Sequence, residues 1–471
     1  MAGYTSVTAE DLAIMLDAIG VGSVEELFDA IPVGVRLGRP IDLPPGEPEQ
    51  AVYAELRRLA ARNVSAEDEI TFLGAGMYDH YVPSIVDMLM SRSEFLTPYT
   101  PYQPEVSQGG LQVMFEYQTA ISELTGLPVS NASVYEGPSA VGAAAYLAKL
   151  TNKRRRVLVG RGVHPHSRAT LETLAVGYGM EVAEIGLDDG VTDLAALRDA
   201  LGDDVSAVIL QQPNFIGAIE DVQAIADAAH GHGALVICAA DPLTLGVLEA
   251  PGNQGADLVV GEGQSLGNRL DFGGPSFGFF AATEKHIRSM PGRIAGETTD
   301  ADGRRGFVLT LQTREQHIRR EKATSNICTS QALNALGGVV YLSWLGRRGI
   351  VELGELMLQR THYARETLSA LDGVDKLHDC PVVREFALRL DADVGRVLER
   401  CAAAGVNAGY ALGRSYEEFG DGLLVAITEQ RSRADIDRLA EVLGAAVAAE
   451  RAGAGAQVAA QVTSSEGLSL R

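Results

Sequence analysis

The stretch ALVICAADPLTLGVLEAPGNQGADLVVGEGQSLG, residues 234–267, carries the pattern that decides the fold. Seven nonpolar or small residues lead directly into Asp241, and a second apolar run, 258–260, leads into a turn that contains Ser265. Runs without polar alternation predict strands that are buried on both faces. Ligands of open α/β sheets bind beyond the carboxyl ends of such strands, so both turns are candidate site positions.

Short apolar runs alternate with helical patterns on both sides of this stretch. The further strand patterns are 157–160, 182–185, 205–210 and 277–282, and the helical patterns between them are 167–178, 193–201 and 221–230. This alternation predicts an α/β large domain with a mostly parallel sheet and helices on both faces. Helical patterns at 331–344, 352–371 and 435–449 surround strand patterns at 382–390, 405–412 and 423–428. They predict a smaller α+β C-terminal domain.

The two ends of the chain differ in composition from its centre. Two short helical patterns are followed by five prolines between Pro32 and Pro48, which is typical of an extended arm. The last twenty residues are small and polar, which predicts disorder. We therefore expect an N-terminal arm over 1–65, a large domain over 66–330, a small domain over 331–450 and a disordered tail over 451–471.

Composition excludes several classes of protein. The 471 residues include 39 Lys and Arg against 62 Asp and Glu, a net charge of −23, which argues against nucleic-acid or anionic-membrane binding. The four cysteines, Cys238, Cys328, Cys380 and Cys401, are scattered and contain no CxxC pair, so neither a disulfide framework nor a zinc site is expected. No signal peptide or long apolar run is present, and we expect a cytoplasmic protein.

Asp241 fits two interpretations. It is either a turn or helix-capping aspartate, or the partner of a pyridinium nitrogen in a pyridoxal phosphate enzyme, which also needs a lysine. In the common architecture that lysine follows the next strand, where Ser265 stands 24 residues after Asp241. Serine cannot form an imine, and the nearest lysine downstream, Lys285, belongs to a different element.

Long motifs in matching order resemble the glycine cleavage system P-protein family, and within it the alpha subunit, or subunit 1, of the two-subunit form. The resemblance extends from about residue 4 to about residue 449. The motifs are FLGAGMYDH (72–80), PYTPYQPEVSQG (98–109), QQPNF (211–215), VGEGQSLG (260–267) and REQHIRREKATSNICT (314–329).

The resemblance implies a pyridoxal-phosphate-dependent transferase-like fold of type I and a heteromeric enzyme. In this family the beta subunit carries the lysine that binds pyridoxal phosphate, which agrees with a serine at position 265. Glycine would lose its carboxylate as CO2, and its aminomethyl group would pass to a lipoyl arm on the H-protein. We expect two alpha and two beta chains, no cofactor held covalently by this chain, and no activity from this chain alone.

The tyrosine- and proline-rich segment 99–108 is the main candidate contribution to the partner's active site. Prolines lower the entropy lost on ordering the segment, and its polar groups suit a small polar substrate. The candidate residues are Tyr99, Tyr102, Gln103, Glu105, Ser107 and Gln108, with His80 as a proton donor near the same place. Alternatively, the tyrosines pack in a structural interface and His80 is a structural histidine.

Other motifs favour ordinary roles. Residues 131–139 precede a helix, and a helix amino terminus can hold a phosphate, but Glu136 places a negative charge there. The pairs His164/His166 and His230/His232 lack a third metal ligand at plausible spacing. The glycines of 261–267 do not form a dinucleotide-binding fingerprint, and the basic run 153–156 suits a helix carboxyl end.

Two alternatives to a catalytic alpha subunit stay open. The chain is either a scaffold or regulatory pseudoenzyme that contributes no active-site group, or an independent pyridoxal phosphate enzyme that uses Lys322 or Lys285. The independent enzyme would absorb visible light when mixed with pyridoxal phosphate, whereas an alpha subunit would not.

Overall fold

The computed structural model describes residues 6–274, 276–325, 327 and 330–466. It divides into two compact units, Met1–Val64 and Ser65–Arg471. The first unit contains helices α1 (Ala9–Ile19) and α2 (Glu49–Ala60) and two short 3-10 turns. None of its described side chains, from residue 6 to residue 64, is buried, so this unit has no hydrophobic core of its own.

A seven-stranded sheet forms the centre of the second unit, with the order β2-β10-β9-β8-β7-β3-β4. Strands β9, β8, β7, β3 and β4 run parallel to one another, whereas β10 is antiparallel to both β9 and β2. The bounds are β2 Val129–Ser130, β3 Arg156–Gly160, β4 Glu181–Ile185, β7 Val205–Gln212, β8 Leu235–Ala240, β9 Leu258–Glu262 and β10 Gly278–Ala282. The predicted mostly parallel sheet is confirmed.

The helices of the second unit begin and end at recognisable caps. Asp193, Asp221 and Asp393 accept backbone N–H groups at the starts of α8, α9 and α12, which satisfies donors that lack a partner within the helix. The helices are α3 Ser84–Met90, α4 Ser93–Leu96, α5 Gln108–Thr125, α6 Gly137–Asn152, α7 Pro165–Tyr178, α8 Leu194–Ala200, α9 Val222–Gly231, α10 Gln316–Arg319, α11 Ala332–Ser369, α12 Val394–Ala403 and α13 Arg433–Glu466.

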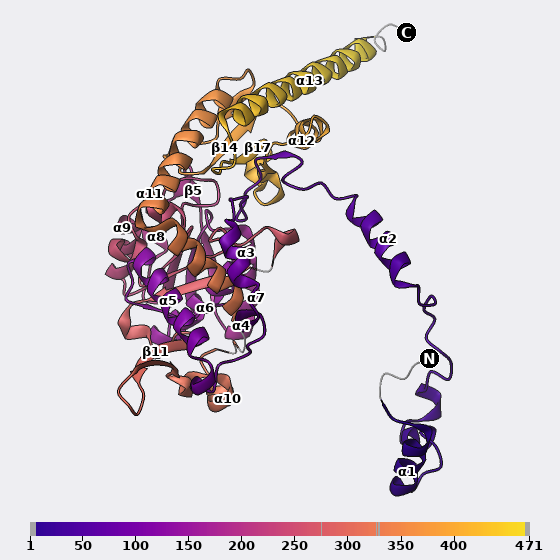
Figure 1. Ribbon diagram of the computed structural model, residues 1–471. Helices are drawn as coiled ribbons and strands as arrows, with labels where there is room; N and C mark the ends of the chain where they lie inside the picture. The colour runs from indigo at the N-terminus through magenta and orange to yellow at the C-terminus, as the bar shows by residue number, and fades with distance from the viewer. Residues whose placement is uncertain (1–5, 275, 326, 328–329, 467–471) are drawn as a thin grey trace. The chain divides into compact units, whose positions relative to one another are not determined.

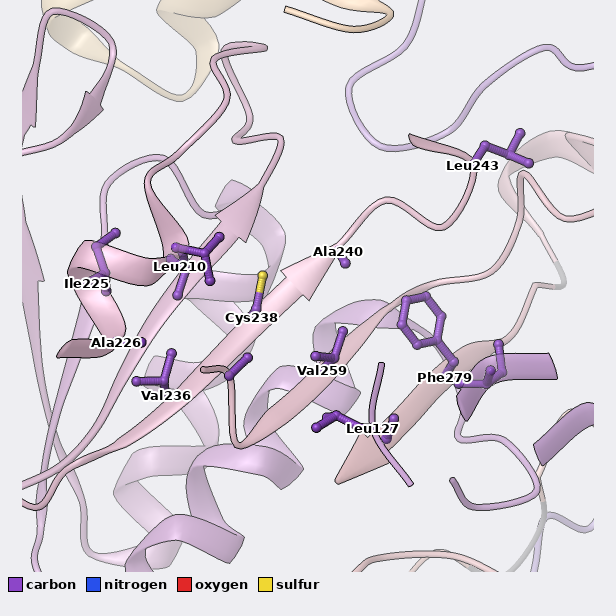
Figure 2. Close-up of a cluster of buried hydrophobic side chains, with 14 of the residues drawn as sticks. Leu127, Leu210, Ile225, Ala226, Val236, Cys238, Ala240, Leu243, Val259 and Phe279 are labelled. Carbon is purple, nitrogen blue, oxygen red and sulfur yellow. The ribbon is translucent and has the colours of Figure 1, made fainter. Parts of the chain in front are cut away.

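Alternate residues of β8 pack on opposite faces of the sheet. Cys238 belongs to a cluster with Leu210 and Val259, and Figure 2 shows these side chains close together on neighbouring strands. Ile237 points to the other face and belongs to a cluster with residues of α6 and α7, such as Val141. A fully buried side chain of this kind contributes about 1.5–3 kcal/mol, so β8 is stabilised from both sides. This explains why its sequence does not alternate.

Helix α11 connects the large sheet to a second, C-terminal core (Figure 1). Its residues up to Met357 pack on the large-sheet core, with Val339 and Met357 as examples, and its last turns pack on the C-terminal core through Ala364 and Leu368. Gly346 interrupts the helical backbone with φ 61° and ψ −178°. The two helical patterns of the sequence are therefore one helix with a break at this glycine.

The C-terminal core is built on a four-stranded antiparallel sheet with the order β13-β14-β17-β16. Its strands are β13 Val374–Lys376, β14 Glu385–Leu390, β17 Gly422–Ala426 and β16 Tyr410–Ala411. The short strand β1 (Ile70–Thr71) pairs in parallel with β15 (Val406–Asn407), so the start of the second unit joins this C-terminal part.

Two hairpins complete the strands and were not predicted from the sequence. They are β5 (Leu187–Asp188) with β6 (Val191–Thr192), and β11 (Ile294–Thr299) with β12 (Arg305–Thr310). Strand β11 has only two buried residues, at its start, so it lacks the apolar run that marks the central strands.

Two expectations about the organisation of the chain differ from the structure or go beyond it. Helix α13 continues to Glu466, whereas disorder was expected from residue 451, because the alanine-rich sequence of 452–460 has a high helix propensity. The division into 66–330 and 331–450 stays a prediction, since residues 65–471 form one compact unit. Cys328 and residues 467–471 lie outside the described residues.

Candidate functional site

The carboxyl ends of β8 and β9 border a cavity of about 580 Å³. Asp241 follows β8 and Glu262 ends β9, and the parallel register of these strands places them side by side. Helix α6 begins at the same cavity with Gly137. The polar lining includes Glu136, His164, Gln211, Asp241, Glu262 and Ser265. This is the position at which open α/β sheets bind ligands.

Asp241 is held in an ion pair with an arginine from the C-terminal part of the chain. Its Oδ2 lies 2.5 Å from Nη2 of Arg384, which is only 3% exposed. Its Oδ1 accepts the backbone N–H of Leu243 at 3.2 Å. The guanidinium carbon also lies 3.4 Å from the centre of the Tyr78 ring. Asp241 therefore acts as a turn residue and as the counter-ion of Arg384.

Two carboxylates accept hydrogen bonds from the backbone N–H groups at the amino terminus of α6. Glu262 accepts the Gly137 N–H at 3.0 Å, and Glu136 accepts the Ser139 N–H at 3.0 Å. Glu262 also accepts the Ser276 hydroxyl and the Gln264 N–H. A side chain at Gly137 would meet Glu262 at 3.1 Å, so glycine is needed for this approach. Burial, together with the nearby Glu136 charge, raises the pKa of Glu262.

These residues do not fit pyridoxal phosphate. Ser265 stands at the end of β9 in place of an imine-forming lysine, and it is 4% exposed. The helix end that would cradle a phosphate already carries Glu136 and Glu262, so a second anion would meet like charges and donors that are already paired. The sequence predicted the first of these carboxylates but not the second.

His80 lies in a buried network beside Arg384, and none of its contacts within the described chain is with the segment 99–108. Its Nδ1 lies 2.6 Å from Glu429, and its Nε2 contacts the Arg384 guanidinium. These contacts therefore agree better with a structural role of His80 than with a role as proton donor near the segment 99–108. Burial lowers the pKa of the cavity residue His164 to about 4, so this imidazole is neutral at physiological pH.

The segment 99–108 presents most of its polar side chains outward. Tyr99 is 77% exposed and Tyr102 is 46% exposed. Within the described residues, no side-chain hydrogen bond is made by the predicted contributors Tyr99, Tyr102, Gln103, Glu105 and Ser107. Gln108 differs, because its amide donates to the carbonyls of Pro104 and Phe307 and accepts the Phe307 N–H. Its role is to attach the segment to β12.

Three residues that the sequence did not single out support this segment. The Arg293 Nη2 donates to the Thr100 hydroxyl at 3.2 Å, and its guanidinium carbon lies 5.9 Å from the centre of the Tyr102 ring. The His317 ring lies 5.2 Å from the same ring, and its Nδ1 lies 3.6 Å from Glu315. No local spacing in the sequence indicates the contacts of Arg293 and His317 with this segment, because they join residues about 200 positions apart.

The histidine pairs serve local structure. His164 Nε2 contacts the Ala75 carbonyl, its Nδ1 accepts the His166 N–H, and His230 contacts Asp257. Among the described side chains, no group of three His, Cys, Asp or Glu residues is arranged to hold a metal ion. Over the same part of the chain, no helix has the length and apolar character needed to cross a membrane.

Comparison with known sequences gives long, nearly complete matches. Residues 3–443 match the family model of the glycine cleavage system P-protein. The chain is 50% identical over 436 residues to a probable glycine dehydrogenase (decarboxylating) subunit 1 of Moorella thermoacetica, covering 93% of this chain and 98% of that protein. It is 49% identical over 444 residues to the protein of the same description from Geotalea uraniireducens, covering 94% and 100%.

Solved structures agree. A crystal structure of glycine decarboxylase (P-protein) of the glycine cleavage system, in an inhibitor-bound form, matches with a TM-score of 0.86 and 45% identity over 94% of this chain and 100% of that chain. The glutamate decarboxylase of Lactobacillus brevis matches with a TM-score of 0.67 at 13% identity, over 91% of this chain and 97% of that chain, which is a likeness of fold alone. The fold is that of pyridoxal-phosphate-dependent transferases of type I.

Proposed function

The chain belongs to the glycine cleavage system P-protein family, and from this premise we propose how it takes part in glycine decarboxylation. It acts as subunit 1 of glycine dehydrogenase (decarboxylating), which is a heteromeric enzyme with a second subunit. The observation that carries the proposal is the cavity at the ends of β8 and β9, whose Ser265, Glu136 and Glu262 do not suit a phosphorylated cofactor.

The partner subunit then holds pyridoxal phosphate, which supplies an electron sink for the loss of CO2 from glycine. The aminomethyl group passes to the lipoyl arm of the H-protein, and the assembly contains two chains of each subunit. A cytoplasmic location suits this role. This chain contributes position and electrostatics rather than a covalent bond to the cofactor.

The segment 99–108 is the part of this chain that we propose to border the partner's active site. Its support from Arg293 and His317 fixes the Tyr102 ring, while the hydroxyl of Tyr102 and the side chains of Tyr99 and Gln103 have no partner among the described residues. These polar groups are exposed and are not engaged with the described residues, so they are available to contact a substrate or a second subunit.

The first unit supports a heteromeric assembly. Its helices α1 and α2 expose large apolar side chains that no core of the unit covers, among them Ile14, Ile19, Tyr53 and Leu56. Apolar surface of this extent is typical of a segment that is buried against another protein. We propose that the first unit packs on the second subunit.

A coexpression experiment tests the active-site contribution. Tyr99→Phe, Tyr102→Phe and Gln103→Ala are each produced together with wild-type subunit 2, and the exchange of bicarbonate carbon into glycine is measured in the presence of H-protein. We expect at least one of these variants to lower the exchange rate about tenfold, the effect of losing one hydrogen bond in a buried site. Tyr81→Phe and Gln112→Ala, at exposed positions outside the segment, are the matched controls.

The same experiment addresses the second candidate function, a scaffold that contributes no active-site group. The poor fit of the cavity to pyridoxal phosphate agrees with both functions, so the variants of the segment 99–108 decide between them. If all three variants copurify with subunit 2 and exchange bicarbonate at the wild-type rate, the active-site contribution is wrong and the scaffold function remains. Loss of copurification would instead assign the segment to the subunit interface.

A further inference from the structure

The cavity at the ends of β8 and β9 has no task in the proposed function, yet it has the size and the walls of a ligand site. Its volume of about 580 Å³ lies within the range of small-molecule sites, roughly 300–1,000 Å³. Apolar groups, including Val141, Met77 and Ala239, and the rings of Tyr78 and Tyr135 form much of the wall.

One polar group in the wall lacks a partner. Ser265 is only 4% exposed and lines the cavity, and its hydroxyl forms no hydrogen bond with any described residue. The Ser265 hydroxyl therefore faces the cavity with its hydrogen-bonding capacity unused by the described protein groups, so a ligand in the cavity can pair with it. The ligand therefore has a polar atom that can reach Ser265.

The charged residues of the cavity wall determine which ligand charge is favoured. Glu136 and Glu262 meet at the start of α6, where they have already taken the N–H groups of Gly137 and Ser139. Asp241 is balanced by Arg384, and His164 makes its ring contact with a neutral carbonyl. An excess of negative charge remains at the α6 end, with no free donors for an anion.

We propose that this cavity binds a small organic amine, with its ammonium group against Glu136 and Glu262 and a second polar group at Ser265. The apolar wall suits an aromatic or aliphatic body between these two ends. This inference goes beyond the proposed function and requires no catalytic role of the chain.

Three probes of similar shape and different charge test the proposal on the full-length chain without subunit 2, so that no cofactor reacts with the amine. Tyramine is cationic, 4-ethylphenol is neutral and 3-(4-hydroxyphenyl)propionate is anionic, and their binding is measured by isothermal titration calorimetry. We expect tyramine to bind about tenfold more tightly than 4-ethylphenol, and the anion more weakly than either.

Variants locate the bound probe. Glu136→Gln with Glu262→Gln is expected to remove the preference for tyramine over 4-ethylphenol, and Ser265→Ala to weaken tyramine several-fold. Glu172→Gln, an exposed change on α7 outside the cavity wall, is the matched control. If the double variant does not fold, Glu136→Gln alone is used, since Glu136 is only half-buried.

Two results would overturn the proposal. One is equal affinity of the wild-type chain for all three probes, or no binding of any of them at about 10 mM. The other is a preference for tyramine that survives Glu136→Gln and Glu262→Gln. Neither result concerns decarboxylation, so the proposed function is tested separately by the exchange assay.

Discussion

Glu385 is a carboxyl group that burial brings close to neutrality. Its Oε1 accepts the Ala75 N–H at 2.7 Å, and its Oε2 accepts the Tyr78 hydroxyl at 2.8 Å. Burial raises the pKa of Glu385 from 4.5 to about 7, although these bonds and Arg384 oppose the shift. Folding therefore favours the protonated carboxyl. Its contribution to stability is greatest below pH 4.5 and is lost as the pH rises through about 7.

We expect Glu385→Gln to remove this loss of stability. The difference in pKa corresponds to about 3 kcal/mol in the free energy of unfolding, so the wild type should lose up to that much more than the variant between about pH 5 and pH 8. Urea unfolding at both pH values measures it, with the exposed Glu123→Gln as the control. Parallel pH dependence of the variant and the wild type would contradict the prediction.

The Asp241–Arg384 ion pair gives a second prediction for single residues. Asp241→Asn leaves the guanidinium without its counter-ion in a place where Arg384 is 3% exposed. We expect a loss of about 3 kcal/mol in the free energy of unfolding, because an uncompensated buried charge is costly. Denaturant unfolding measures it.

The double variant Asp241→Asn with Arg384→Met is the control for this prediction. The single variant leaves the Arg384 guanidinium without a counter-ion, and the double variant removes that guanidinium. The double variant should therefore be less destabilised than Asp241→Asn alone. A double variant that is as unstable as the sum of the two single variants would show that the pair does not act as a unit.

At the scale of the element, the break in α11 depends on one glycine. Gly346 has φ 61° and ψ −178°, a conformation that other residues rarely adopt, and no atom lies within 4 Å of the position that its Cβ would take. A substitution there changes the backbone energy without a steric clash. Residues on both sides of the break, such as Val339 and Met357, pack on the large-sheet core.

We therefore expect Gly346→Ala to lower the free energy of unfolding by about 1–3 kcal/mol through backbone strain alone. Gly349→Ala, three residues later in the same helix, is the control and should change stability by about 1 kcal/mol or less. Chemical denaturation compares the two. Equal effects at both positions would mean that the break in α11 does not require a left-handed glycine.

At the scale of the whole molecule, the first unit does not bury the apolar side chains of its helices. Val52, Leu56 and Leu59 recur on one face of α2, and all three are exposed within the first unit. The chain also carries a net charge of −23, which keeps such a surface soluble until a partner covers it. Assembly with the second subunit is the state in which this surface would be removed from water.

Leu56→Asp is expected to weaken copurification of subunit 2 at least tenfold, because a charge replaces an apolar contact in the proposed interface. The thermal midpoint of the chain alone should not change, since Leu56 belongs to no buried core of the first unit. Ala54→Asp places the same charge on the opposite face of α2 and is the control. Copurification that both variants leave at the wild-type level would exclude this face from the interface.

The sequence by itself determined the class of the fold and the absence of the cofactor lysine. Apolar runs such as 234–240 predict buried strands because the pattern that marks such a strand lies in residues that are adjacent in the sequence. The identity of residue 265 and the motifs around it are likewise local. The tail over 451–471 stays a prediction, although α13 extends to Glu466, because small residues suit both a helix and a disordered segment.

Only the tertiary structure decided which distant side chains meet. Arg384 reaches Asp241, Glu262 reaches the start of α6, Gln108 holds β12, and His80 lies with Glu429 rather than with the tyrosines of 99–108. Each of these pairs joins residues more than a hundred positions apart along the chain. No spacing in the sequence encodes them, because the packing of whole sheets and helices sets these distances.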